Sequence, residues 1–297
     1  MRKTLLVIMG PTAVGKTALA IDVAQALGTE IISCDSRQFY QELNIGVARP
    51  SDEELAAARH HFIACRSVQS PFNAWQYEQE ALNLLNQLFE RNDTMVAVGG
   101  SGLYVDALCN GIALLPDPSP ELRQQLTRQI QEEGLEPLQK QLEALDPEYY
   151  AVVDRHNPAR LQRALETIIT AGRPYSEIIQ QSLAPRSFNI VKVALNCDRN
   201  LLKDRIYKRV DIMMEEGLLD EVKSVLPQRN INTLNTVGYK ELFAHLDGDI
   251  TLAEAIQQIK NHTWQYAKKQ LTWLRRYNNI HWIDRSTTVE EVLGYCN

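Results

Sequence analysis

Apolar residues run directly into a phosphate-binding pattern, G-x-x-x-x-G-K-[ST], in the stretch Leu5-Leu6-Val7-Ile8-Met9-Gly10-Pro11-Thr12-Ala13-Val14-Gly15-Lys16-Thr17. In this pattern the backbone N–H groups close around phosphate oxygens, the lysine supplies positive charge and the last hydroxyl can bind Mg²⁺. Residues 18–27 have a helical pattern that ends at Gly28, so the loop joins a strand to a helix whose positive dipole end faces the anion. We therefore expect residues 10–17 to hold a di- or triphosphate, with Thr17 as a metal ligand.

Further apolar segments recur along the chain, with helical patterns between most of them: residues 30–34, 95–98, 190–196 and 280–283. This alternation predicts an α/β fold, in which a parallel sheet built on the phosphate loop (P-loop) has helices on both faces. The alternation stops between residues 113 and 189, where three closely spaced prolines open a run of helical segments. We expect a helical insertion domain there, and an α/β core made of residues 1–112 and 190–297.

Composition places the chain among ordinary globular proteins. It has 297 residues, 44% of them hydrophobic, and a net charge of -6. Five scattered cysteines include no C-x-x-C pair, which favours neither a disulfide framework nor a zinc site and suits a reducing compartment. No apolar segment approaches the length of a membrane span. We expect a cytoplasmic protein without an obligate protein partner, monomeric by default.

Two strand ends carry candidate chemistry. Asp35 follows the second strand, at the carboxyl edge where ligands of α/β sheets lie, and could act as a general base, as an outer Mg²⁺ ligand or as a helix cap. The third strand ends in Gly99 and Gly100, where an ATPase would usually place a metal-binding aspartate. These glycines would let a ligand approach the backbone beside the hydroxyl of Ser101, although a simple strand-to-helix turn explains them nearly as well.

Cations recur on two later helical segments. Arg205 and Arg209 lie four residues apart and share a helix face, which suits diphosphate recognition or, equally, a solvated face. Residues 264–277 interleave aromatic side chains with four cations; the cations could reach RNA phosphates, whereas the spacing of the aromatics favours core packing. The pair His60-His61 lacks companion ligands, so a loop or packing role is expected there.

The chain resembles the tRNA dimethylallyltransferases of bacterial length, also called tRNA isopentenyltransferases. The matching segments span nearly the whole chain in order: residues 10–17, 33–36 with Tyr40, 44–50, 98–104, 160–166, 237–241 and 267–276. The phosphate loop occurs in many enzymes, but its combination with the Asp35 turn and the K-Q-L-T-W block near the carboxyl terminus is specific.

The resemblance implies transfer of a dimethylallyl group from dimethylallyl diphosphate to the N6 amine of the adenosine just 3′ of the anticodon in tRNA, assisted by Mg²⁺. Carried over, Asp35 accepts the N6 proton, Ser101 hydrogen-bonds the reacting region, and Arg209 with Lys16 holds the departing diphosphate. The implied RNA contacts, in which the insertion and the terminal block clamp the anticodon stem-loop, are Asp35, Ser36, Arg37, Gln38, Ser101, Arg123, Arg160, Leu161, Gln162, Arg163, Lys268, Lys269, Gln270 and Arg275.

The sequence departs from the family pattern in places. Threonine is usual at Ser101 and common at Val47, and lysine is common at Arg49. Three alternatives stay open: an adenylate isopentenyltransferase acting on a free nucleotide, a kinase that uses the loop for ATP, and a nucleic-acid-binding switch without chemistry. The helical insertion and the basic terminal block favour tRNA over a free nucleotide.

Overall fold

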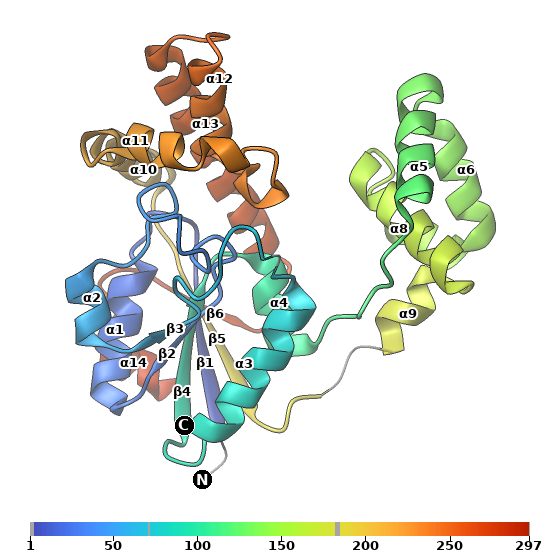
Figure 1. Ribbon diagram of the computed structural model, residues 1–297. Coiled ribbons are helices and arrows are strands. Elements are labelled where there is room, and N and C mark those ends of the chain that lie inside the picture. Colours follow the sequence, from blue (N-terminus) through green and yellow to red (C-terminus); the bar gives the residue numbers. More distant parts are fainter. Residues whose placement is uncertain (1–2, 71, 182–184, 297) are drawn as a thin grey trace. The chain divides into compact units, whose positions relative to one another are not determined.

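The computed structural model describes residues 3–70, 72–181 and 185–296. The chain divides into two compact units, one formed by Met1–Cys109 with Arg186–Asn297 and the other by Asn110–Pro185. Figure 1 shows the course of the chain through both.

The first unit contains a six-stranded sheet in which every paired strand is parallel. The strands, in the spatial order β3-β2-β4-β1-β5-β6, are β3 (His60–His61), β2 (Ile31–Ser33), β4 (Thr94–Gly99), β1 (Thr4–Met9), β5 (Asn189–Leu195) and β6 (Ile280–Ile283). The predicted parallel α/β sheet is confirmed. Strand β3 lies where a loop was expected, because two residues are too few to show a strand pattern.

Helices cover both faces of this sheet (Figure 1). On β1, Leu5, Val7 and Met9 pack into one buried cluster with α3 (Ala74–Leu88) and α4 (Gly102–Asn110). Leu6 and Ile8 pack into the other, with α1 (Lys16–Leu27) and α14 (Val289–Gly294). Burial on both faces explains why β1 reads as a continuous apolar run. Each fully buried side chain contributes roughly 1.5–3 kcal/mol.

Further helices of this unit lie near the carboxyl ends of the strands (Figure 1): α10 (Arg199–Glu215), α11 (Leu218–Ser224), α12 (Tyr239–Leu246) and α13 (Leu252–Leu274). Short elements complete it: α2 (Asp52–Ala57), η1 (Leu226–Gln228) and η2 (Asn232–Leu234). Strand β1 lies between β4 and β5. The chain leaves β1 toward one side of the sheet and leaves β4 toward the other, and such a reversal opens the crevice in which α/β proteins bind ligands.

The described part of the second unit contains helices and no strand. Its helices are α5 (Pro120–Glu133), α6 (Glu136–Leu145), α7 (Pro147–Val152), α8 (Pro158–Ala171) and α9 (Tyr175–Gln181). Proline occupies the first turn of α5 to α8, where its missing N–H costs no hydrogen bond. The unit has its own apolar core, formed by Leu126, Leu138, Leu142, Val153, Leu161, Ala164, Leu165 and Ile168. None of the helices in the described part of the chain has the length and apolarity needed to cross a membrane.

Candidate functional site

The phosphate loop leaves the amino-terminal end of α1 open to an anion. The helix is preceded by Gly15, which has no side chain to bond the first N–H groups. Lys16 folds back over the loop and donates from Nζ to the carbonyl of Pro11 (2.8 Å). Burial lowers the pKa of Lys16 to about 8; the charge of Asp35 opposes this shift and that of Arg209 adds to it. A bound anion would favour the charged amine again.

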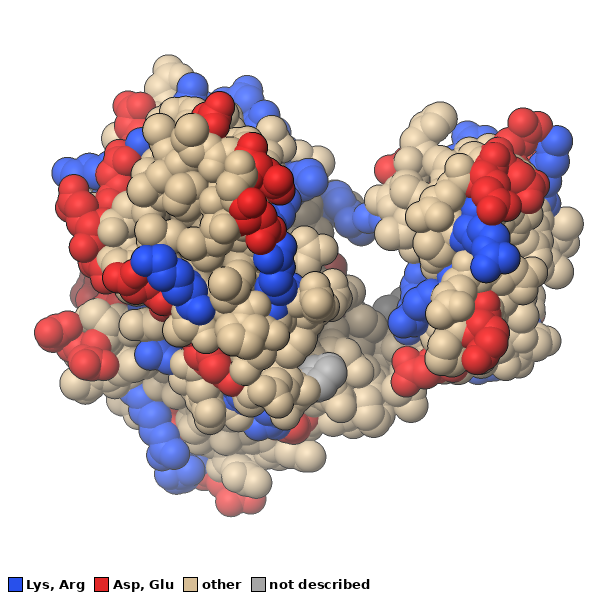
Figure 2. All heavy atoms as spheres, turned by 45° about the horizontal axis from the view of Figure 1, so that its top comes forward, with Lys and Arg blue, Asp and Glu red and all other residues tan. Residues whose placement is uncertain are grey.

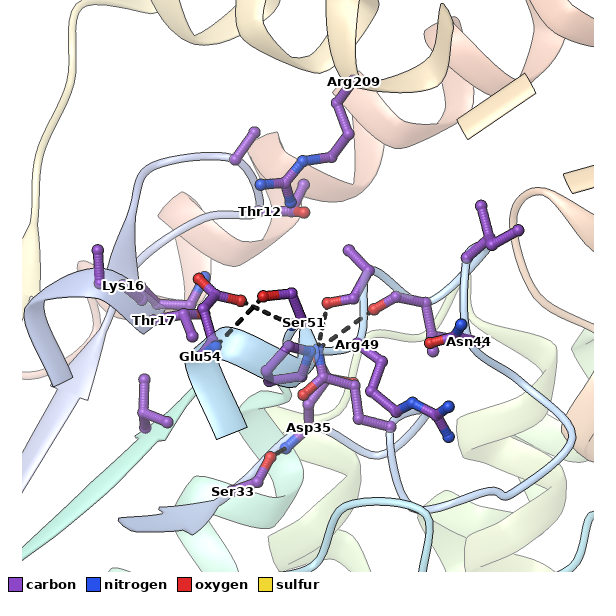
Figure 3. A pocket seen from close by; sticks show the side chains of 18 of the residues that line it. Thr12, Lys16, Thr17, Ser33, Asp35, Asn44, Arg49, Ser51, Glu54 and Arg209 are labelled. Atoms are coloured by element: carbon purple, nitrogen blue, oxygen red, sulfur yellow. Dashed lines mark hydrogen bonds between the residues drawn. The ribbon is translucent and has the colours of Figure 1, made fainter. Parts of the chain in front are cut away.

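Two cavities meet beside this loop, one of about 770 Å³ and one of about 250 Å³. Lys16, Asp35 and Arg209 line both, so two cations and a carboxylate stand where the cavities join. The other shared residues are Thr12, Val47, Ala48 and Met213. In Figure 3, Lys16 and Thr17 lie on one side of the larger cavity, and Arg209 reaches from α10 toward Thr12.

The turn after β2 holds Asp35 in place through local hydrogen bonds. Asp35 Oδ1 accepts the N–H of Arg37 (3.0 Å). Ser101 Oγ, at the end of β4, accepts the N–H of Ser36 (3.0 Å) and lies 3.2 Å from the Ser36 hydroxyl. Ser101 is only 8% exposed and lies outside the linings of both cavities. Ser101 therefore connects the end of β4 to the turn that carries Asp35.

The side chains after Asp35 differ in their surroundings. Ser36 and Arg37 line the smaller cavity. Arg37 also donates to the carbonyl of Thr233 (2.9 Å). Gln38 lines the larger cavity, but its amide donates to the carbonyls of Val47 (3.2 Å) and Ala48 (2.8 Å). Gln38 thus ties the Asp35 turn to a neighbouring loop, a role that the sequence did not indicate.

Gln270 is largely enclosed between the phosphate loop and the end of β4. It is 6% exposed, its Nε2 donates to the carbonyl of Gly100 (2.9 Å), and its Oε1 accepts the N–H of Thr12 (2.8 Å). A Cβ added at Gly100 would overlap the Gln270 amide, which explains a glycine at this strand end. Both ends of its amide thus join the phosphate loop to the end of β4, while Gln270 also lines the smaller cavity, so its contact with tRNA stays a prediction.

Arg205 and Arg209, both on α10, have different surroundings. Arg209 enters the cavities, and burial lowers the pKa of its guanidinium while the charge of Glu54 opposes that shift. Arg205 instead directs Nη1 to the sulfur of Cys197 (3.9 Å) and lines neither cavity. The spacing of four residues showed that Arg205 and Arg209 share a helix face, but it could not show that only Arg209 of the two lines the cavities.

One aromatic residue of α13 lies at the site, contrary to the expectation of core packing. Trp273 packs against the core and donates to Asp106 (3.1 Å), as expected. Tyr266 is 42% exposed and lines the smaller cavity. Its hydroxyl end is nevertheless enclosed, and this burial together with the charge of Asp35 raises the pKa of Tyr266 to about 12. Tyr266 lies four residues before Gln270, so the two share a helix face, and this spacing could have predicted that both line the same cavity.

Apolar side chains form much of the smaller cavity, and the sequence analysis assigned none of them to a ligand: Val47, Ile206, Val210, Met213, Leu218, Val237 and Ile259. They come from the loop after the Asp35 turn, from α10, α11 and α13, and, for Val237, from the segment between η2 and α12. Such a wall can accept a short hydrocarbon chain beside the cations.

The oxygen ligands present fit a magnesium ion shared with a diphosphate. Thr17, Asp35 and Glu54 line the larger cavity. The described residues contain no group of three or more His, Cys, Asp or Glu side chains able to hold a metal. This arrangement suits Mg²⁺, which binds through a few protein oxygens together with water and substrate phosphates.

In the second unit, some of the residues predicted to bind tRNA are exposed to solvent and others are not. Arg123 and Arg160 are exposed. Arg123 and Arg163 flank the buried carboxylate of Glu166 (3.3 and 3.7 Å). Gln162 donates to the same carboxylate (3.0 Å). Leu161 is fully buried in the core of this unit, so the prediction that its side chain binds tRNA is wrong.

In the first unit, Lys268, Lys269 and Arg275 are exposed along and just after α13. Lys268 Nζ lies 5.8 Å from the centre of the Trp264 ring. Lys and Arg are interspersed with Asp and Glu on the face that Figure 2 shows. Any attraction of RNA phosphates to that face therefore depends on local cations.

Comparisons with known proteins agree with this geometry. A family model described as IPP transferase matches residues 38–277. The chain is 45% identical to the tRNA dimethylallyltransferase of Flavobacterium johnsoniae, covering 99% of this chain and 97% of the relative. It is 46% identical to tRNA dimethylallyltransferase 1 of Bacteroides thetaiotaomicron, covering 99% and 96%.

Solved structures give the same result. The full-length tRNA isopentenylpyrophosphate transferase from Bacillus halodurans matches with a TM-score of 0.72 and 34% identity, covering 99% of this chain and 96% of that one. A eukaryotic dimethylallyltransferase acting on tRNA shares the fold, with a TM-score of 0.77 and 24% identity over 95% of this chain and 74% of that one. The chain therefore belongs to the IPP transferase family, together with the bacterial tRNA dimethylallyltransferases.

Proposed function

We propose that the chain transfers a dimethylallyl group from dimethylallyl diphosphate to the N6 amine of the adenosine just 3′ of the anticodon in tRNA. The observation that carries this proposal is the junction of the two cavities at Lys16, Asp35 and Arg209. A diphosphate on the loop and an adenine in the adjoining space would place the bond to be broken and the attacking amine beside the same carboxylate.

The cations act on the leaving group. As the C–O bond between the allylic carbon and the diphosphate breaks, its electron pair goes to the diphosphate. Lys16, Arg209 and the N–H groups at the start of α1 stabilise that developing charge, and such electrostatic stabilisation usually accounts for most of the rate enhancement. Thr17, diphosphate oxygens and waters would hold Mg²⁺. When bound, the ion would offset negative charge on the diphosphate.

Asp35 acts on the nucleophile. The lone pair of the N6 amine is delocalised into the adenine ring, so the amine attacks well only if it is oriented and loses a proton as the new N–C bond forms. The Asp35 carboxylate takes that proton. Hydrogen bonds from Arg37 to Asp35, and from Ser36 to Ser101, keep the carboxylate at the junction.

The acceptor must leave its stack in the anticodon loop, at a cost of a few kcal/mol. Tyr266 and the apolar wall offer a surface for the base or the hydrocarbon chain. Arg123, Arg160, Lys268, Lys269 and Arg275 supply phosphate contacts that offset the cost. The reaction takes place in the cytoplasm in this proposal, which suits a protein whose five cysteines are all free.

The test is transfer of a labelled dimethylallyl group, with Mg²⁺, to an anticodon stem-loop and in parallel to AMP. Labelled RNA alone is the expected result, and it should disappear when Asp35→Asn replaces the wild type. Labelled AMP alone would replace the proposal by transfer to a free nucleotide. Label on neither acceptor, with ATP consumed, would replace it by kinase activity.

A further inference from the structure

The carboxylate of Glu221, on α11, collects four hydrogen bonds from two distant parts of the chain. Three come from consecutive backbone N–H groups and one from a tyrosine hydroxyl: Asn44 to Oε2 (3.0 Å), Ile45 to Oε2 (2.7 Å), Gly46 to Oε1 (2.9 Å) and Tyr239 to Oε1 (2.6 Å). The donors belong to segments 44–50 and 237–241, which carry the family resemblance, and none of the four donor residues has a task in the proposed reaction.

Consecutive N–H groups that converge in this way form a concave anion site. Here the anion is internal, because the Glu221 carboxylate fills the site. Hydrogen bonds to an ionised acceptor are roughly twice as strong as neutral ones. Without the carboxylate, the three N–H groups would need new partners, and a partly buried turn offers few.

Tyr239 closes the site from the other side. Its side chain is fully buried, and a Cβ added at Gly46 would lie 2.7 Å from the ring. The ring therefore packs against the backbone of the turn, and its hydroxyl reaches Glu221. This close approach gives a physical reason for glycine at residue 46.

The turn continues directly into the wall of the active site. Val47 and Ala48 line both cavities. The Gln38 amide binds both of their carbonyls, and Ala48 has a φ of 49°, which is unfavourable for a residue with a Cβ. The neighbouring turn and Gln38 thus hold Ala48 in a conformation that it would not adopt alone.

The helices next to Glu221 supply further residues of the cavity walls. Arg209 and Met213, on α10, line both cavities, and Leu218, the first residue of α11, lines the smaller one. One carboxylate therefore connects the side of the cavities that carries Arg209 to the side that carries Val47.

We propose that Glu221 is a positioning residue for the diphosphate donor. It fixes the turn at residues 44–46, so that Val47 and Ala48 stand as a preformed wall beside Lys16 and Arg209. The inference rests on the proposed function, because it takes the ligand between these walls to be the prenyl donor. Preforming the wall avoids ordering it when the donor binds, and that raises affinity.

The first measurement is hydrogen–deuterium exchange of the segment 43–49 in wild type and in Glu221→Gln. The amide keeps one acceptor oxygen but directs an NH₂ group at other donors, so exchange of the N–H groups at 44–46 should rise about tenfold or more. Asp220→Asn is the matched control, because it removes the same charge from an exposed position on the same helix and leaves the turn alone.

The second measurement separates positioning from folding. In Glu221→Gln the KM for dimethylallyl diphosphate, and the Kd for the same molecule by calorimetry, should both rise about tenfold, while the Kd for an anticodon stem-loop changes less than about twofold. Tyr239→Phe removes one of the four donors and should give a smaller change in the same direction, so the idea stays testable if Glu221→Gln does not fold.

Unchanged exchange in Glu221→Gln would overturn the inference, as would faster exchange with unchanged donor KM and Kd. Equal effects of Asp220→Asn would reduce the role of Glu221 to general charge. Exchange and calorimetry need no prenyl transfer. If the wild-type protein bound the donor but did not modify RNA, the proposed function would be disproved. Exchange and calorimetry would still test whether Glu221 positions the wall beside the donor.

Discussion

Raising the pH from about 7 to about 9 should weaken capture of the donor through a single group, the Lys16 amine. Its pKa is lowered to about 8 by burial in the ligand-free protein. The diphosphate favours the charged amine, so binding is strongest below that pKa and is lost progressively as the pH rises through it. The charged fraction falls from roughly nine-tenths to roughly one-tenth over this interval, so kcat/KM for the donor should fall about tenfold.

The assay is kcat/KM for dimethylallyl diphosphate across this pH range, with saturating stem-loop RNA and fixed Mg²⁺. Lys16→Arg is the control, because a guanidinium does not titrate there, and its activity should be independent of pH. A flat wild-type profile, or the same decline in Lys16→Arg, would refute the assignment. The lowered pKa also affects stability: the unfolded chain binds this proton more tightly, so the ligand-free protein should gain stability between about pH 8 and 10.5.

Four further outcomes are expected. Asp35→Asn should slow transfer at least about 100-fold in single-turnover assays while the Kd for RNA changes only a few-fold, since the carboxylate acts on a proton; a large loss of RNA binding would contradict the base assignment. Gln270→Met should lower the free energy of unfolding by about 2 kcal/mol in urea titrations and raise the donor KM, because Thr12 and Gly100 lose their partner. Lys268→Ala should reduce the salt dependence of RNA binding by about one phosphate contact; an identical slope would remove this lysine from the interface. Met213→Ala should raise kcat/KM for a ten-carbon allylic diphosphate relative to the five-carbon donor by about tenfold, because it widens both cavities; an unchanged ratio would show that Met213 does not limit chain length.

Elements whose cause is local could be predicted from the sequence. The strand, phosphate loop and helix at residues 5–27 follow from an apolar run, a glycine pattern and a helical period within one short stretch. Asp35 could be placed near that loop because the carboxyl ends of parallel strands share one edge of the sheet. Both residues of the pair Lys16 and Asp35 line the same cavities.

Predictions that assigned a direction to a side chain fared less well. Leu161 belongs to a segment with a family resemblance, but its side chain lies in the core of the second unit. The bridge that Gln270 makes between Thr12 and Gly100 was not indicated by the sequence. Tyr266 looked like a core residue and lines a cavity. A helical period shows which residues share a face of the helix, but it does not show whether that face packs in the core, lines a cavity or faces solvent.

The sequence by itself thus determined the phosphate loop, the parallel sheet, the helical character of residues 120–181 and the family of the chain, because each depends on neighbours in the chain or on motifs read in order. Only the tertiary structure decided which polar side chains form hydrogen bonds within the protein between segments far apart in the sequence. Thr12 meets Gln270 across 258 positions, and Ile45 meets Glu221 across 176. Such pairings depend on how distant elements pack around the sheet, and no local pattern encodes the partner.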